Sequence, residues 1–321
     1  AFRSHAKANG VDGSPLDVRP LVLAFVLALF VLGVIGSGLG DVFSAGTAPP
    51  AGMIVVLVAG LAVLAAGILF AARASTRKWE RWMRLSQFAQ ANRMHFATSS
   101  PDPGYPGMIF TRGDSRRATD HMMSTAGRFF DLGNYQYTTG SGRSRRTSYW
   151  GFLAFHLDRN LPNMVLDSRS NNGFFGTNLP ESFGRNQVLS LEGDFDRHFT
   201  LYAPKEYERD ALYLFTPDLM ALLIDEASPF DVEIVDDWMF IYSARPFDSL
   251  QPASYQRLFS IMATVGAKTL SQSARYSDER AFAPGMIAPQ GARLRRGVSV
   301  LSVVAVTGIG AYWIWSLFFD R

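Results

Sequence analysis

Two pairs of histidine and carboxylate are the first residues in this sequence that suggest chemistry. His156 stands two residues before Asp158 in an apolar segment, and His198 stands two residues after Asp196. At this spacing both members of a pair would share one face of a strand. A metal site needs further ligands, and acyl transfer needs a nucleophile beside the base. Neither pair has such a residue close by in the sequence, so we expect structural histidines, no catalytic residue, no metal site and no cofactor.

Other motifs of catalysis and nucleotide binding are missing as well. The glycine-rich run Gly36–Gly40 superficially matches a dinucleotide-binding fingerprint. That fingerprint needs a strand before it and a helix after it, whereas this run ends a long apolar block, where small residues allow membrane helices to pack closely. The sequence also lacks a nucleophile-elbow serine. It contains no cysteine, which excludes disulfides and thiolate metal sites.

An arginine-rich segment is the best candidate for a binding surface. Arg143, Arg145 and Arg146 stand among Gly and Ser residues, a composition typical of an exposed hairpin tip. Guanidinium groups bind phosphate or carboxylate through two parallel hydrogen bonds. The target could be lipid headgroups, a nucleic acid or an acidic partner, and the alternative is a solvated turn that keeps the hairpin soluble. We take anionic lipids of the inner leaflet as the expected partner and do not expect nucleic acid.

A second charged feature is an acidic run in the last third of the chain. Calcium loops place carboxylates at alternate residues around a glycine, and this run has no such pattern. The sequence therefore predicts a solvated acidic edge, formed by Asp225, Glu226, Asp231, Glu233, Asp236 and Asp237.

Three long apolar blocks set the overall architecture. Leu21–Leu39, Gly52–Ala72 and Gly297–Phe319 contain no charged side chain. A helix needs about 20 apolar residues to cross the hydrocarbon core of a bilayer, so each block predicts a transmembrane helix. The first block follows twenty other residues and precedes a second block, which argues against a cleaved signal peptide.

The distribution of Lys and Arg predicts the orientation of these helices. The link between the first two blocks, residues 40–51, has no Lys or Arg. Basic clusters instead flank the region between the second and third blocks, at Arg73–Arg84 and Arg293–Arg296. Because cytoplasmic flanks are enriched in Lys and Arg, we expect residues 73–296 in the cytoplasm. The protein would be a multi-pass protein of the plasma membrane, with its N-terminus inside and its C-terminus outside.

The residues between the second and third blocks divide into two parts. Residues 73–95 continue the second span as a polar juxtamembrane helix, and the Pro- and Gly-containing residues 101–107 follow as a connector. The predicted layout is a membrane hairpin in residues 1–72, the juxtamembrane helix, a soluble domain in residues 96–292, and the third transmembrane helix in residues 293–321.

Within the soluble domain, strand patterns come before helical ones. Aromatic-rich runs at 128–138 and 148–158 predict a long hairpin. Further patterns predict short strands at 163–167, 187–191 and 198–202, helices at 205–215, from Pro217 and at 254–270, and two strands in Asp231–Tyr242 joined at Asp236–Asp237. Strands followed by helices without regular alternation favour an α+β fold with an antiparallel sheet and packed helices.

Several stretches of the soluble region resemble a known group of proteins. They are GMIF (107–110), SRRATD (115–120), GNYQYTTGSG (133–142), WGFLAFHL (150–157), LPNMVLD (161–167), EYERDALYLFTPDLMALLIDEA (206–227) and VEIVDDW (232–238). Together they resemble a family of uncharacterised actinobacterial membrane proteins that carry a domain of unknown function. The resemblance covers most of residues 85–245. It implies a single soluble domain, and it assigns no catalytic residues.

These observations favour a non-enzymatic integral membrane protein, an accessory or scaffold subunit of a membrane complex. Its cytoplasmic domain, basic in residues 73–146 and acidic in residues 147–292, would bind other membrane subunits or a second copy of itself. One alternative is a membrane-tethered enzyme whose polar residues meet only in the fold, which a pocket uniting His156, Asp158 and arginines would favour. The other is a transport component, against which the uncharged spans argue, since conduction paths need a polar lining.

Overall fold

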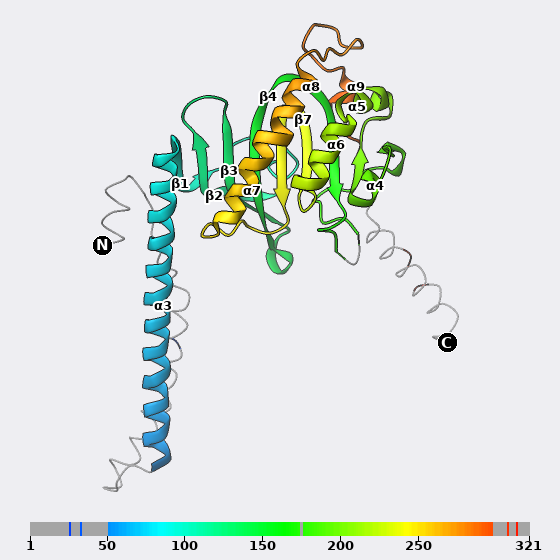
Figure 1. Cartoon of the computed structure of the whole chain (residues 1–321). Coiled ribbons are helices and arrows are strands. Elements are labelled where there is room, and N and C mark those ends of the chain that lie inside the picture. The colour runs from blue at the N-terminus through cyan, green and yellow to red at the C-terminus, as the bar shows by residue number, and fades with distance from the viewer. Residues whose placement is uncertain are drawn as a thin grey trace. The chain divides into compact units, whose positions relative to one another are not determined.

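The computed structural model describes residues 26, 33, 51–173, 176–297, 307 and 313 of the 321-residue chain (Figure 1). The chain forms two compact units, Ala1–Phe88 and Ala89–Arg321. The first and third predicted transmembrane helices fall almost entirely outside the described residues, so these two spans stay predictions.

The first unit is dominated by helix α3 (Ala51–Ala91). Among the described residues, one helix is long and apolar enough to cross a membrane, over Val58–Ala91 with a mean hydropathy of 1.9. Large apolar side chains such as Val58, Leu61 and Phe70 are exposed along it, as a lipid-facing surface requires. The helix continues without a break into the polar segment after Ala72. The second apolar block therefore has the length, composition and conformation of a membrane span.

In the described part of the chain, seven strands of the second unit form one antiparallel sheet, so the predicted α+β class is confirmed. The order is β1-β2-β3-β4-β6-β5, and β7 pairs with β4. The strands are β1 (Met94–Pro101), β2 (Asp114–Ser124), β3 (Phe130–Thr139), β4 (Arg146–Ser168), β5 (Val188–Leu189), β6 (Phe199–Tyr202) and β7 (Asp231–Ser243).

Strand β4 is the centre of the sheet. Its first half pairs with β3 from Arg146 to Phe155, and its end pairs with β6 from Val165 to Ser168. Strand β7 runs along the opposite edge of both halves. The β4–β7 register shifts on either side of Leu161, and such bulges bend a strand. The bend lets one long strand pair with two shorter strands in succession.

The predicted hairpin is confirmed as β3 and β4, joined through the 3₁₀ turn η1 (Gly142–Ser144). The strand predicted at 163–167 is the last part of β4. The prediction of two strands in Asp231–Tyr242 is wrong, because β7 is continuous. Asp236 has a φ of 54°, a left-handed conformation that Asp tolerates better than most residues. It stands opposite Leu161, where the register between β4 and β7 shifts. Strands β1 and β2 were not predicted.

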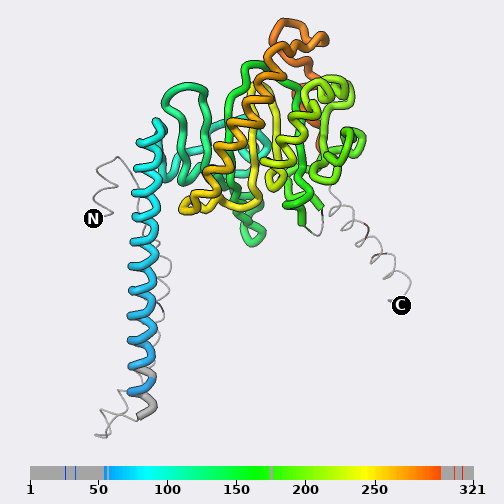
Figure 2. The backbone as a smooth tube through the Cα atoms, in the orientation of Figure 1, coloured from blue at the N-terminus to red at the C-terminus, as the bar shows by residue number. Residues whose placement is uncertain are grey.

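Helices cover one face of the sheet (Figures 1 and 2). The longest is an almost continuous helix made of α7 (Pro252–Ile261), the π-helical turn η5 (Met262–Gly266) and α8 (Ala267–Ser273). Its buried side chains include Leu258, Ile261 and Val265, as the predicted amphipathic stripe requires. The shorter helices are α4 (Phe195–His198), α5 (Glu208–Leu214), α6 (Pro217–Leu222), η4 (Leu223–Ala227) and α9 (Pro289–Ala292), with 3₁₀ turns η2 (Arg185–Gln187) and η3 (Lys205–Tyr207).

A loop packs on the sheet residues that point away from these helices. Alternate residues of β7 point to opposite faces, and Trp238, Phe240 and Tyr242 stack along one of them with ring centroids 5.7 and 5.8 Å apart. Phe110, from the loop between β1 and β2, packs against Phe240 at 5.6 Å. The segment predicted as a plain connector, residues 101–107, therefore leads into a part of the core, Met108–Phe110.

Candidate functional site

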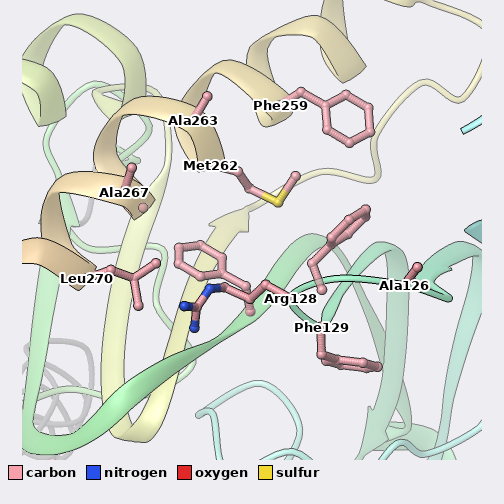
Figure 3. Close-up of a pocket in the computed structure, with 11 residues that line it drawn as sticks. Ala126, Arg128, Phe129, Phe259, Met262, Ala263, Ala267 and Leu270 are labelled. Carbon is pink, nitrogen blue, oxygen red and sulfur yellow. The ribbon is translucent and has the colours of Figure 1, made fainter. Parts of the chain in front are cut away.

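An apolar groove lies between the long helix and the sheet and is a candidate binding site (Figure 3). Its volume is about 420 Å³, within the range of ligand pockets. Figure 3 shows Met262, Ala267 and Leu270 on the helix side and Arg128 and Phe129 on the sheet side. The remaining lining residues are Ala126, Phe130, Phe155, Phe259, Ala263 and Gly266. A lining of aromatic, small and thioether side chains suits an apolar ligand.

The helix wall of the groove is irregular where it meets the sheet. The π-helical turn η5 adds an extra residue to the helix, a feature that is frequent at functional sites. Gly266 at its end lies so close to the Phe155 ring that an added Cβ would approach Cζ to 3.1 Å. Glycine thus lets the backbone rest on the sheet, while Ala263 and Ala267 beside it leave the groove open to solvent.

Arg128 is the charged residue of this lining, and its charge is already paired. Its guanidinium donates to both carboxylate oxygens of Asp158, at 2.7 and 3.2 Å, and the hydrogen bond to Arg128 lowers the pKa of Asp158. The carbonyl of His156 accepts from the same group at 3.3 Å. The predicted pair His156 and Asp158 is therefore separated: Asp158 binds arginine, and the His156 ring pairs with Asp237 at 3.2 Å.

His156 and His198 have structural surroundings. The His156 ring lies against Trp238 with centroids 3.7 Å apart, and neither His156 nor Asp158 lines the groove. His198 ends helix α4, not a strand as predicted, while Asp196 accepts from Ser190 and from the backbone of Leu191. Within the ranges that the structure describes, no three His, Asp or Glu residues are grouped as metal ligands.

The Arg-rich hairpin tip is exposed, as predicted. Arg143, Arg145 and Arg146 all lie at the surface between β3 and β4. Arg145 donates to the hydroxyl of Ser115 at 3.3 Å. Among the described residues none of the three arginines forms an ion pair, so their charges are available to an external anion.

The predicted solvated acidic edge is wrong for two of its six residues. Asp231 and Glu233 are 0% and 4% exposed, because both point into the interior from alternate positions of β7. Asp236 and Asp237 do lie near the surface, paired with Arg293 and His156. The sequence shows the charges but not which face of the strand is covered.

Glu233 is the centre of a buried hydrogen-bond network. One carboxylate oxygen accepts from the Met108 N–H and the Tyr242 hydroxyl, both at 2.7 Å, and the other lies 3.5 Å from the Asn163 amide. Asn163 in turn accepts from the Leu294 N–H at 2.9 Å. Burial raises the pKa of Glu233 to about 7 despite these donors. The network joins β4, β7 and two loops, which is a structural task.

The sheet assembles a serine–histidine–aspartate array that no motif in the sequence indicates. The Ser100 hydroxyl lies 2.7 Å from Nε2 of His121, and Nδ1 of His121 lies 3.0 Å from the Asp131 carboxylate. Tyr105 donates to the second oxygen of Asp131 at 2.9 Å. The residues stand on β1, β2 and β3, so no spacing in the sequence could have indicated them. The order of contacts is that of a nucleophile, a base and an orienting acid.

The array lacks one part that acyl-transfer sites use. The N–H of the residue after the nucleophile often forms the oxyanion hole, and Pro101, which follows Ser100, has no N–H. Ser100 itself stands opposite Ala118 in the β1–β2 ladder, so it is not presented on a sharp turn. His121 and Asp131 are 2% and 0% exposed. The described geometry fits a hydrogen-bonded strand connection better than a finished active site.

Comparisons with known proteins do not place the chain in a family. No family model matches it, and no curated protein matches it. It is similar in part to the crystal structure of the mycobacterial trehalose monomycolate transport factor A, TtfA, with 13% sequence identity and a TM-score of 0.36. The match covers 59% of this chain and 89% of that chain. At these values the similarity gives no argument about function.

Proposed function

We propose that this protein is a membrane-anchored accessory subunit that works by binding, and that the groove under the long helix α7–α8 receives the apolar side chains of an amphipathic helix of another membrane subunit. The observation that carries this proposal is the groove itself, an open apolar trough beside a π-helical turn. The apolar part of α3 supports the membrane anchor. Membership of the actinobacterial family that the sequence resembles is part of the proposal.

The form of the groove favours a helical peptide as the occupant. Amphipathic helices bind such grooves by inserting apolar side chains at i, i+3 or i+4 and i+7. A volume of about 420 Å³ accommodates a few such side chains and not a whole helix, and the open side leaves the polar face of the peptide in water. Met262 adapts to different side chains, since a thioether is flexible and polarizable.

A photo-crosslinking experiment tests the groove. The full-length protein is produced in its native membranes with p-benzoylphenylalanine at Ala267 or at Ser271, both exposed on α8. Only Ala267 lines the groove, so Ser271 is the matched control. We expect crosslinks from Ala267 to an amphipathic helical segment of a membrane protein, and their loss in an Ala263→Asp variant. Equal crosslinking from both positions, or none from either, would overturn the proposal.

The exposed hairpin arginines support a second contact, with anionic lipid headgroups. Each basic residue near an anionic bilayer surface contributes about 1 kcal/mol at physiological salt. The test uses the full chain in zwitterionic nanodiscs mixed with vesicles rich in phosphatidylglycerol. Replacing Arg143, Arg145 and Arg146 with Ser should abolish salt-dependent association. A control with Arg197, Arg209 and Arg275 replaced removes the same charge elsewhere, and an equal effect there would show that the hairpin is only a turn.

The orientation in the membrane is also part of the proposal. The basic residues in Arg73–Arg84 and Arg293–Arg296 support a cytoplasmic domain, and the three apolar blocks of the sequence support a multi-pass topology with three spans. Because the chain has no cysteine, single cysteines can be introduced on a clean background. A cysteine at Ser44 should react with an impermeant reagent in intact cells, and one at Ser271 should not. The reverse labelling pattern would invert the topology.

A membrane-tethered serine hydrolase is a second candidate function, which the Ser100–His121–Asp131 array favours. In that reaction the Ser100 hydroxyl would attack an ester carbonyl while its proton moved to His121, which would pass it to the leaving alcohol. Water, with His121 again as the base, would then attack the acyl group on Ser100, release the carboxylic acid and restore the hydroxyl. A fluorophosphonate probe tests this directly. Labelling of the wild type that is lost in Ser100→Ala and His121→Ala would favour the hydrolase. Equal or absent labelling of all three proteins leaves the binding function.

A further inference from the structure

The loop between α8 and α9 presents large apolar side chains to solvent. Phe282 is 95% exposed, more than any other large apolar side chain of the described residues, and Met286 is 57% exposed. Figure 1 shows this loop projecting beyond α8 and α9. An aromatic ring left in water forgoes the stabilisation that burial gives. The tip of this loop is therefore a candidate for contact with another molecule.

Hydrogen bonds fix the loop at its base and near its tip. The buried carboxylate of Asp278, at the start of the loop, accepts from the backbone N–H of Ala288 at its end, at 2.9 Å. Near the tip, the Asn160 side chain donates to the Gly285 carbonyl at 2.7 Å. A loop that is already ordered loses little conformational freedom when it binds. Phe282 is thus presented on a prepared support.

A hollow lies beside the base of this loop, between α5 and the residues that follow α8. Its volume is about 580 Å³, and Leu212, Tyr213, Tyr276 and Arg280 are part of its lining. The Tyr213 and Tyr276 rings have their centroids 6.5 Å apart. Aromatic rings and guanidinium planes both stack on other aromatic rings. The hollow therefore suits a phenylalanine side chain.

The same hollow carries free charges of both signs. Arg209, Arg275 and Glu279 also line it, and none of the three forms an ion pair within the described ranges. The Arg280 charge is instead held by Asp210 at 3.1 Å. Complementary charges across an interface favour one partner and one register. A surface with both signs unpaired offers this complementarity to a copy of itself.

We propose that a second copy of this chain binds here, with Phe282 of each copy in the hollow of the other. A two-fold dimer needs a self-complementary surface, on which residue i meets residue j and residue j meets residue i. A projecting phenylalanine beside a hollow meets this requirement, and so does a free glutamate beside free arginines. An anionic bilayer fits the loop less well, because Glu279 adds a negative charge close to Phe282 in the chain and the Arg280 charge is already paired. The dimer does not depend on the apolar groove under α7–α8.

The oligomeric state of the full-length protein in a neutral detergent is the first test. Sizing over a concentration series should show a monomer–dimer equilibrium. Phe282→Ala should weaken dimerisation by roughly thirtyfold, as truncation of a central aromatic anchor does. Tyr149→Ala removes an exposed aromatic ring of β4 and should leave the equilibrium unchanged. A monomer at every concentration, or an unchanged dissociation constant in Phe282→Ala, would overturn the proposal.

Charge reversal tests the two-fold exchange itself. Glu279→Arg places arginine opposite arginine in both contacts, and Arg209→Glu combined with Arg275→Glu places glutamate opposite glutamate. Neither protein should therefore dimerise with itself. An equimolar mixture of the two, with different affinity tags, should co-purify as a heterodimer, because each contact again joins opposite charges.

Two results would count against the exchange. One is a mixture that stays monomeric, or self-association of either charge variant as strong as that of the wild type. The other is association of the full chain in zwitterionic nanodiscs with phosphatidylglycerol-rich vesicles that Phe282→Ala abolishes, without any dimer. That outcome would assign the loop to the membrane surface and overturn the dimer.

Discussion

The start and the middle of strand β7 hold carboxylates in opposite environments. Asp231 and Glu233 point into the interior and are almost fully covered. Asp236 and Asp237 follow within a few residues, and their side chains are 39% and 44% exposed. The first two accept hydrogen bonds from buried donors, whereas the other two form ion pairs in contact with water.

The difference follows from what covers each part of the strand. The loop that carries Met108 and the end of β4 cover the start of β7, so the carboxylates there become part of the interior. At Asp236 the left-handed residue turns the side chain toward Arg293 at the surface. Carboxylates on the same strand thus contribute differently to stability. The low dielectric of the interior strengthens each hydrogen bond of the buried pair, and water weakens the ion pairs of the exposed pair.

The largest expected effect is that of Glu233→Ala. It leaves the Met108 N–H and the Tyr242 hydroxyl buried without an acceptor, and each unsatisfied group costs about 1 to 3 kcal/mol. We expect a loss of about 3 kcal/mol or more, seen as a fall of roughly 6 to 12 °C in the unfolding midpoint. Glu233→Gln keeps an acceptor oxygen and should lose much less. Equal losses in both variants would show that volume, and not hydrogen bonding, matters there.

The next effect is a pH dependence of opposite sign to that of a paired surface carboxylate. Burial raises the pKa of Glu233 from 4.5 to about 7, so between these values the folded state binds more protons than the unfolded state. Stability should therefore fall as pH rises from about 4 to about 7, by roughly 3 kcal/mol for this group. The free energy of unfolding of the wild type minus that of Glu233→Gln, measured across this pH window, isolates the contribution of the Glu233 carboxyl. If this free-energy difference increased with pH, the predicted sign would be wrong.

The fold class was predictable because its signals are local. Aromatic alternation identified the β3–β4 hairpin, and a stripe of apolar residues identified the long helix. Strands β1 and β2 were missed because their residues, such as the polar run Asp114–Asp120, lack that alternation. Only pairing with their neighbours makes them strands. The break expected at Asp236 coincides with a left-handed residue, but the strand continues through it and no turn forms.

The candidate sites depend on contacts between residues far apart in the chain. The hairpin arginines were found because their exposure follows from a Gly- and Ser-rich turn. The groove joins residues 126–130 to residues 259–270 across the sheet, and the Ser100–His121–Asp131 array joins three strands. Asp231 was seen as part of an acidic run, but its burial depends on how the chain covers the start of β7. Which of these distant residues meet in the fold cannot be read from their spacing in the sequence.

A smaller effect is expected at Asp236, where two contributions can be separated. Its carboxylate forms a bidentate pair with Arg293 at 2.8 and 2.9 Å, and its backbone is left-handed. Asp236→Asn keeps a residue type that tolerates this conformation and removes the charge, so it should cost less than about 1 kcal/mol. Asp236→Ala adds about 1 kcal/mol of backbone strain. Identical unfolding midpoints for the two variants would remove the strain from the explanation.

The smallest effect is expected at Asp237, because its pair with His156 lies in water. Asp237→Ala should change the free energy of unfolding by less than about 0.5 kcal/mol. His156→Ala should cost more, since it also removes the ring contact with Trp238 at 3.7 Å. A double-mutant cycle between the two positions separates the ion pair from the ring contact. We expect a coupling below about 0.5 kcal/mol at pH 7, decreasing further in high salt. A coupling above about 1 kcal/mol would mean that water does not weaken this pair, and the contrast between the two parts of β7 would then need another cause than burial.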